Sequence, residues 1–164
     1  MNRTVMNTFV GFLLIVITGC GFQLRGAANI PESLKTMYVQ GVNFQSGIGL
    51  ELKRGLASNG VTVLPTFQEG SAVLSLFDAK SERRVLSVGG DAKVREYQLY
   101  SAVTVKLVNA DNEVMIASDR IEALRDYVFD QDQVLASDQE EALLRRELNE
   151  QLARNILRRL SVLQ

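Results

Sequence analysis

Hydrophobic and polar positions recur with different periods along this chain, and each period predicts a different element. Leu34–Gln40 alternates apolar and polar side chains, which predicts a strand because successive strand side chains point to opposite faces. In Ile48–Leu56 the apolar residues recur every four positions, which predicts an amphipathic helix. Ser46 is the candidate N-cap of this helix. Asn59-Gly60 predicts its end, because glycine tolerates the left-handed conformation of a helix cap.

Strands dominate the middle of the chain. Val61–Leu64 is short, β-branched and followed by Pro65, whereas Ala72–Val88 predicts either one long strand or two short ones. Gly89-Gly90-Asp91 predicts a hairpin turn in which glycine supplies the positive φ angle. Val94–Val108 then returns as an antiparallel partner, and its odd-numbered positions are expected to form the buried face.

A second hairpin and a further strand are expected next. Asn109–Asn112 predicts the turn, and Val114–Val128 predicts the returning strand. The apolar positions of this strand shift from even numbers at Ile116 to odd numbers at Ile121, and back to even numbers by Leu124. Either bulges or a break into two strands would explain the shift.

The C-terminal segment carries the clearest helix pattern. Ser137-Asp138-Gln139-Glu140 fits a capping box, in which the serine binds a free backbone N–H and Glu140 reaches back. An apolar stripe with a spacing of four follows this box. Its members are Leu144, Leu148, Leu152, Ile156 and Leu160, widened by Leu143, Ala153 and Leu157. We expect this face to pack on a sheet rather than in a coiled coil, because a four-residue repeat drifts from a 3.5-residue seam.

The order of these elements predicts an α+β fold. Two amphipathic helices and a mixed, mainly antiparallel sheet of four to five strands form a two-layer sandwich. We find no internal repeat and no low-complexity linker. Residues 33–164 are therefore expected to form a single domain.

The N-terminal segment predicts export and lipid attachment. Arg3, the apolar run Phe9–Ile17 and the small residues before Cys20 are typical of a lipoprotein signal peptide, here residues 1–19. The apolar run is shorter than the roughly 20 residues that a membrane-spanning helix needs. We therefore expect Cys20 to be lipidated rather than to act as a reactive thiol, with residues 20–32 as a tether.

Composition narrows the classes of function. The chain has no histidine and a single cysteine, which excludes Ser-His-Asp and Cys-His catalysis, histidine metal sites and a disulfide within the chain. Carboxylate-only or Ser-Lys chemistry stays open in principle, although no motif for either stands out. Loss of residues 1–19 removes only Arg3 among charged residues, so the formal net charge goes from −1 to −2. This balance argues against a nucleic-acid partner, and we expect neither an enzyme nor a cofactor or metal.

Basic residues near the first hairpin turn are the candidate binding site. They are Arg83, Arg84, Lys93 and Arg95, which flank the turn, and Arg120 on the next strand, with Arg125 as a further neighbour. Clustered arginine and lysine side chains bind anionic phosphates. The alternative, which the pattern alone favours, is a solvated strand surface where these cations pair weakly with nearby acids. Tyr97, Tyr100, Tyr127 and Phe129 lie on or near the same strands, either in the core or on a partner surface.

Several segments together resemble one family. Cys20-Gly21-Phe22-Gln23-Leu24-Arg25-Gly26 resembles the start of mature lipopolysaccharide-assembly lipoproteins of the LptE family. The resemblance continues in Glu96-Tyr97-Gln98-Leu99, in Arg125-Asp126-Tyr127 and in Val134-Leu135-Ala136. It extends into the leucine-rich C-terminal helix and so covers nearly the whole mature chain.

This resemblance implies a function and a partner. Members of the family have a two-layer sandwich fold and sit as a plug inside the outer-membrane β-barrel LptD, in a one-to-one complex. They support assembly of the barrel and help to insert lipopolysaccharide into the outer leaflet. The resemblance also implies lipopolysaccharide contact through basic residues near the strand ends, which fall near Lys93 and Arg120 here. It thus implies a lipid-anchored, periplasm-facing outer-membrane protein in the barrel lumen.

Two other classes of function are weighed against this one. An accessory lipoprotein of another lipid-trafficking system, of the ABC type, would share the anchor and a similar sandwich. A periplasmic hydrolase is disfavoured by the missing histidine and the lack of a nucleophile motif.

Overall fold

The computed structural model describes residues 30–163 of the chain. The predicted signal peptide, Cys20 and most of the predicted tether lie outside the described residues. Ile30 is only 2% exposed and belongs to the hydrophobic core, although it falls in the segment predicted as a tether. The packed domain therefore includes residues before position 33.

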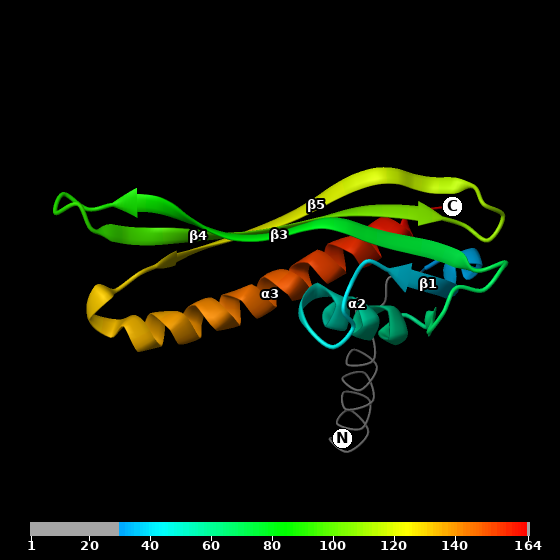
Figure 1. Ribbon diagram of the computed structural model, residues 1–164, viewed down its shortest axis with the longest axis horizontal. Coiled ribbons are helices and arrows are strands. Elements are labelled where there is room, and N and C mark those ends of the chain that lie inside the picture. Colours follow the sequence, from blue (N-terminus) through cyan, green and yellow to red (C-terminus); the bar gives the residue numbers. More distant parts are fainter. Residues whose placement is uncertain (1–29, 164) are drawn as a thin grey trace, which may run out of the picture.

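The described chain forms one five-stranded sheet and two α-helices (Figure 1). The elements are η1 (Glu32–Leu34), β1 (Thr36–Gln40), α2 (Gly47–Ser58), β2 (Thr62–Leu64), β3 (Ala72–Val88), β4 (Val94–Val108), β5 (Val114–Val128), η2 (Gln131–Gln133) and α3 (Val134–Ser161). The strand order is β2-β1-β3-β4-β5. β1 runs parallel to β2 and β3, whereas β3, β4 and β5 form an antiparallel meander. This mixed α+β architecture confirms the predicted fold class.

Both α-helices lie on one side of the sheet, and the other side has no helix over it in the described part of the chain (Figure 1). The main core joins β1, β3 and β4 to α2 and to the C-terminal half of α3. A second cluster lies farther along the sheet and contains Leu99, Ala123, Tyr127, Leu148 and Leu152. The long β3–β4 hairpin thus continues beyond the part of the sheet that α2 covers (Figure 1).

The odd-numbered side chains of β4 are buried, as predicted, but side chains on its opposite face are buried as well. Leu99, Val103 and Leu107 are fully buried toward the helices, as their odd-numbered positions predict. On the opposite face Tyr100 and Thr104 are also buried, at 7% and 6% exposed. Arg84 of β3 and Arg120 of β5 cover Tyr100, an effect of long side chains that strand alternation does not predict.

Bulges explain the irregular strands. Ala72–Val88 is one strand, and its pairing with β4 shifts between Phe77 and Lys80, where Asp78 has a φ of 52°. In β5 the register shifts twice between its start and Asp119. The shift of apolar parity between Ile116 and Ile121 is therefore the product of bulges. No second shift follows, because Leu124 is exposed on the face without helices.

The start of α3 differs from the prediction. The helix begins at Val134, three residues before the predicted cap, and its N-cap is Gln133. Ser137 lies inside the helix, where its hydroxyl donates to the Asp130 carbonyl. The stripe from Leu148 to Leu160 is buried as predicted, but Leu143 is 53% exposed and does not widen it. No side chain of the described residues caps the start of α3, so the predicted capping box is absent; the short 3-10 turn η2 in front of α3 is itself capped by the Asp130 side chain.

The first hairpin lies where it is predicted, but its backbone differs. Gly89 closes the turn by donating to the Lys93 carbonyl and accepting from Ala92. The positive φ belongs to Ala92, at 60°, and not to Gly89 or Gly90. The first helix, in contrast, ends as predicted, with Gly60 at a φ of 75°.

Candidate functional site

The structure separates the predicted basic residues into three groups. Arg84 and Arg120 lie on the sheet face that no described helix covers, Arg83 lies on the helix side, and Lys93 and Arg95 lie at the hairpin end. The candidate residues therefore do not form one basic cluster at one end of the sheet. Alternation of strand side chains places neighbours such as Arg83 and Arg84 on opposite faces.

Arg84 and Arg120 share one tyrosine on the open face. The Arg84 guanidinium stacks on the Tyr100 ring, 4.0 Å from its centroid. The Tyr100 hydroxyl accepts from Arg120 at 3.1 Å and donates to Glu122 at 2.6 Å. Glu82 pairs with Arg84 at 2.8 Å, and Glu122 pairs with Arg120 at 3.0 Å. Both guanidinium groups are thus already matched by carboxylates of their own strands.

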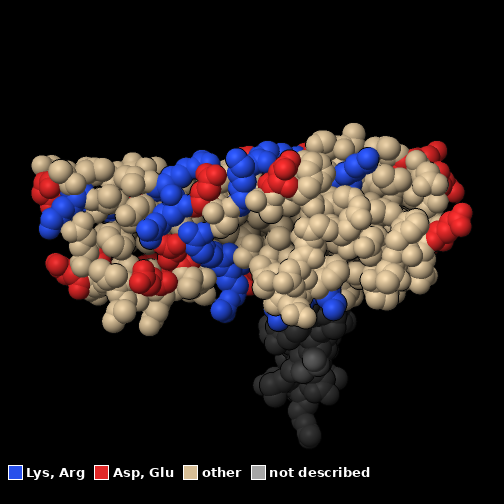
Figure 2. All heavy atoms as spheres, viewed as in Figure 1, with Lys and Arg blue, Asp and Glu red and all other residues tan. Residues whose placement is uncertain are grey.

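These contacts shift the pKa values of Glu122 and Arg120, but both side chains remain charged at neutral pH. The hydrogen bonds from Tyr100 and then Arg120 lower the pKa of Glu122. The hydrogen bonds to Tyr100 and then Glu122 raise the pKa of Arg120 above its ordinary value. On the side of the molecule drawn in Figure 2, acidic side chains lie among the basic ones.

Arg83 lies on the helix side of the sheet, where other side chains already bind it. Its guanidinium lies 4.5 Å from the centroid of the Tyr97 ring and donates to Glu141 of α3 at 2.9 Å. The hydrogen bond to Glu141 is the main reason that the pKa of Arg83 is raised. In this arrangement Arg83 joins the strand to the helix and is not free for an external anion.

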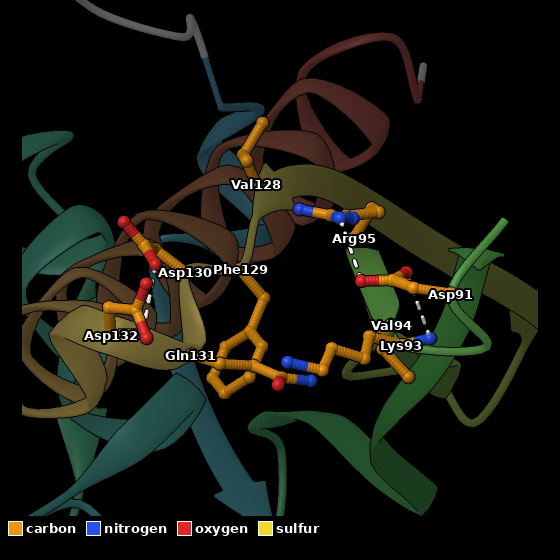
Figure 3. A pocket seen from close by; sticks show the side chains of 9 residues that line it. All are labelled: Asp91, Lys93, Val94, Arg95, Val128, Phe129, Asp130, Gln131 and Asp132. Carbon is orange, nitrogen blue, oxygen red and sulfur yellow. Dashed lines mark hydrogen bonds and ion pairs between the residues drawn. The ribbon is translucent and has the colours of Figure 1, made fainter. Parts of the chain in front are cut away.

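Lys93 and Arg95 line a cavity of about 390 Å³ at the end of the β3–β4 hairpin. We call it the hairpin-end cavity; Figure 3 shows its side chains. Its lining residues are Asp91, Lys93, Val94, Arg95, Val128, Phe129, Asp130, Gln131 and Asp132. The hairpin provides one wall, and the end of β5 with η2 provides the other. Its volume is in the range of small-molecule sites.

Charge in the hairpin-end cavity is mixed. Arg95 is paired with Asp91 at 3.0 Å, and the Asp130 carboxylate accepts from the Asp132 backbone N–H at 2.9 Å. The Lys93 backbone N–H donates to the Asp91 carboxylate at 3.4 Å, but its ammonium group has no ion pair within 4.0 Å among residues 30–163. The side chain extends across the cavity toward Phe129 and Gln131 (Figure 3). The Lys93 ammonium can bind a phosphate oxygen, whereas the carboxylates of Asp91, Asp130 and Asp132 can accept from hydroxyl groups but repel an anion.

The structure also shows whether the aromatic residues lie in the core or on an exposed surface. Tyr127 is 5% exposed and packs on Tyr97, which in turn meets Phe129 edge to face, with ring centroids 5.2 Å apart. Tyr100 is 7% exposed under its two arginines. These rings therefore belong to the core and its margins and do not form an exposed aromatic surface.

The cavity wall from η2 was not predicted as part of a site. Gln131 and Asp132 line the same cavity as Lys93 because β4 and β5 have matching lengths. The Phe129 backbone N–H, which donates to the Arg95 carbonyl, fixes the end of β5 there. The only local signal is Asp130, whose side chain caps the 3-10 turn. Sequence spacing across a meander of bulged strands does not determine such proximity.

Neither a metal site nor a membrane-spanning helix is present in the described part of the chain. Residues 30–163 contain no group of three or more acidic or cysteine side chains placed to hold a metal ion. Over the same residues, no helix has both the length and the apolar composition needed to span a membrane.

Comparison with known proteins points to one family. The profile of the LptE family, described as lipopolysaccharide-assembly, matches residues 34–160. The LPS-assembly lipoprotein LptE of Photorhabdus laumondii is 29% identical over 163 residues, which cover 98% of this chain and 87% of that protein. The similarity thus spans nearly the full length of both proteins.

Solved structures of lipoproteins have the same fold. Lipoprotein B of Nitrosomonas europaea, described as uncharacterised, superposes with a TM-score of 0.70 at 27% identity, covering 86% of this chain and 90% of that one. The rare lipoprotein B of Shewanella oneidensis gives a TM-score of 0.67 at 25% identity, covering 77% and 93%. The two-layer sandwich is therefore shared with lipoproteins from other bacteria.

Proposed function

The chain belongs to the lipopolysaccharide-assembly family LptE, and from this premise we propose that it supports and plugs an LptD β-barrel. The match over residues 34–160 is the observation that carries the proposal, because it covers both layers of the sandwich. In this function the protein forms a one-to-one complex in the barrel lumen and takes part in lipopolysaccharide insertion into the outer leaflet. The role is structural and needs no catalytic group.

The proposal includes the membrane anchor. Residues 1–19 are removed on export, and Cys20 receives the lipid that holds the protein at the periplasmic side of the outer membrane. Cys20→Ala should leave the protein soluble in the periplasm, whereas Ser101→Ala, a control inside the domain, should stay with the membrane fraction. Recovery of the Cys20→Ala variant in the outer membrane at the wild-type level would contradict lipid anchoring.

Electrostatics of the surface is compatible with a plug. On the open sheet face Arg84 and Arg120 are matched by Glu82 and Glu122 of their own strands. A surface with little excess charge avoids strong repulsion or nonspecific adhesion inside a barrel. Its polar side chains remain available for hydrogen bonds to a polar lumen.

Depletion of the protein tests this function in its own bacterium. We expect the folded form of the barrel, recognised by its heat-dependent electrophoretic mobility, to decrease, and newly made lipopolysaccharide to stop reaching the surface. An accessory lipoprotein of another lipid-trafficking system would leave both unchanged and alter the phospholipid distribution instead. That second outcome would overturn the proposal.

Direct contact with lipopolysaccharide is proposed at the hairpin-end cavity. Lys93 is its cation without a carboxylate partner among residues 30–163, and Arg95 can turn from Asp91 toward a phosphate at small cost, because an exposed pair is worth about 0–1 kcal/mol. Arg84 and Arg120 on the open face form a second contact of lower affinity, since each already has a carboxylate. Arg83 contributes only through the position of the hairpin, because it is bound to Glu141.

Charge reversal separates these two surfaces. Lys93→Glu should weaken binding of purified lipopolysaccharide about tenfold or more, since a charge-assisted hydrogen bond is replaced by repulsion. The double variant Arg84→Glu and Arg120→Glu should weaken it less. Equal binding by wild type and Lys93→Glu, with both proteins folded by circular dichroism, would remove the cavity from the proposed site.

A further inference from the structure

The two halves of α3 are held to the sheet in different ways. From Leu148 to Leu160 the helix buries six apolar residues, whereas between Val134 and Glu147 it buries only Ser137. Apolar area removed from water is the main source of packing free energy. In the first half of α3 only the partly buried Leu144 packs against the second apolar cluster, so apolar contacts alone hold this half weakly.

A polar attachment of this half of the helix is centred on Glu141. Its Oε2 accepts from Arg83 at 2.9 Å and from the Tyr127 hydroxyl at 2.6 Å. Its Oε1 accepts from Arg145 at 2.8 Å, and Arg145 also donates to Ser81 at 2.7 Å. One carboxylate thus connects β3, β5 and α3, which lie far apart in the sequence. We call this group the Glu141 network.

Burial makes the Glu141 network stronger than a surface ion pair. The Glu141 side chain is 15% exposed, compared with 45% for Glu147, which approaches Arg125 of β5 at 4.0 Å. Burial opposes ionisation of Glu141, but the hydrogen bonds from Tyr127, Arg145 and Arg83 outweigh it, so its pKa is lowered. Charge-assisted hydrogen bonds in such a setting are about twice as strong as neutral ones.

The Glu141 network lies next to the hairpin-end cavity. Arg83 stacks on Tyr97, and the Tyr97 ring contacts both Tyr127 and Phe129. Phe129 lines the cavity together with η2, which leads directly into α3. A movement of the first half of α3 would therefore shift one wall of the cavity relative to Lys93 on the other wall.

We propose that Glu141 is a positioning residue that holds η2 and the first half of α3 against the β3–β4 hairpin and thereby sets the width of the hairpin-end cavity. The mechanical part of this inference stands on the contacts of Glu141 alone. The consequence for lipopolysaccharide rests on the proposed function of the cavity. Glu141 itself touches no ligand and acts through the elements that it joins.

Hydrogen exchange of the full-length protein, measured by mass spectrometry, tests the mechanical part without any ligand. Glu141→Gln should raise exchange rates in residues 130–147 about tenfold or more and leave residues 148–161 near the wild-type rates. Glu147→Gln is the matched control, since it removes the longer and more exposed pair of the same helix. It should leave both segments unchanged.

Two results would overturn the inference. Wild-type exchange rates for residues 130–147 in Glu141→Gln would show that the Glu141 network does not stabilise η2 and the first half of α3. An equal rise in residues 148–161 would show that Glu141 supports the whole domain and not one end of it. A variant that does not fold is replaced by Arg83→Gln, which removes one arm of the network and should give the same local pattern in weaker form.

Lipopolysaccharide binding then tests the consequence for the site. Glu141→Gln should weaken binding severalfold while every cavity residue is intact, and adding Lys93→Glu should have less effect in Glu141→Gln than in wild type. If wild type and Lys93→Glu bind equally, the proposed ligand of the cavity is wrong, and the exchange result still decides the inference about Glu141. If Lys93→Glu weakens binding and Glu141→Gln does not, Glu141 does not position the site.

Discussion

At the scale of single residues, the environment of a side chain decides its contribution more than its type does. Leu143 and Leu152 are both leucines of α3, yet Leu143 is 53% exposed and Leu152 is 2% exposed. Glu141 and Glu147 differ in the same way, as a carboxylate with several short hydrogen bonds and one with a distant ion pair. Substitutions at these matched positions should therefore have very different effects.

Leu152→Asp should be among the most destabilising changes in the chain. It places an unpaired charge in the cluster of Leu99, Ala123, Tyr127 and Leu148, which costs about 3–5 kcal/mol. Such a loss approaches the whole stability of an ordinary domain. Chemical unfolding followed by circular dichroism measures it, with Leu143→Asp as the control that should change stability by no more than about 0.5 kcal/mol. Equal effects of the two variants would contradict the packing of this helix face on the sheet.

Stability should depend on the ionisation of Glu141 in acid. Its pKa is lower in the folded protein than the ordinary 4.5, so its contribution is complete above that value and is lost as the pH falls through the lowered pKa. Arg83, Arg145 and Tyr127 donate to it. Burial, followed by the hydrogen bond to Glu141, raises the pKa of Tyr127 to about 12.

Unfolding curves between neutral pH and pH 3 measure this contribution. Glu141→Gln should be less stable than wild type by about 1–3 kcal/mol at pH 7, and the difference should shrink below about pH 4, as the carboxylate becomes protonated. In Glu147→Gln the difference from wild type should be small at every pH. A wild-type advantage that grows as the pH falls would contradict a lowered pKa for Glu141.

At the scale of elements, periodicity predicts which segments are strands and helices, but not the turns between them. The four-residue spacing of α3 and the alternation of β4 give the correct faces because burial follows Cβ direction. The start of α3 and the residue with positive φ in the first hairpin, Ala92, differ from the prediction. Several local sequences can begin a helix or form a tight turn, so the sequence does not single out one residue. The basic residues lie in three separate places because of the bulges and lengths of the strands. A pattern in one sequence does not determine either of these.

Gly60 and Gly90, in two different turns, should respond differently to substitution by alanine. Gly60 has a φ of 75°, so Gly60→Ala should cost about 1–2 kcal/mol, although there is room for the methyl group. Gly90 has no positive φ and also faces open space, so Gly90→Ala should be neutral or slightly stabilising. Thermal unfolding of both variants checks this pair. Equal destabilisation would mean that the hairpin turn has the glycine-dependent backbone expected from the sequence.

At the scale of the whole molecule, the asymmetry of the two layers is the main structural feature. α2 and the second half of α3 pack one end of the sheet into the main core, while the β3–β4 hairpin reaches beyond it to the hairpin-end cavity (Figure 1). One end is thus held by apolar packing, and the other carries polar contacts, Lys93 and the Glu141 network. This division suits a plug that is fixed at one end and meets lipid at the other.

Co-purification with the barrel decides whether the protein is a plug. The tagged full-length protein is extracted with detergent from the outer membrane of its own bacterium and separated by size-exclusion chromatography. We predict that it elutes in a one-to-one complex with the LptD barrel, and that Leu152→Asp, which loses much of its folding stability, yields far less complex. Recovery of the folded wild-type protein alone, from membranes in which the barrel is present, would contradict the proposed role.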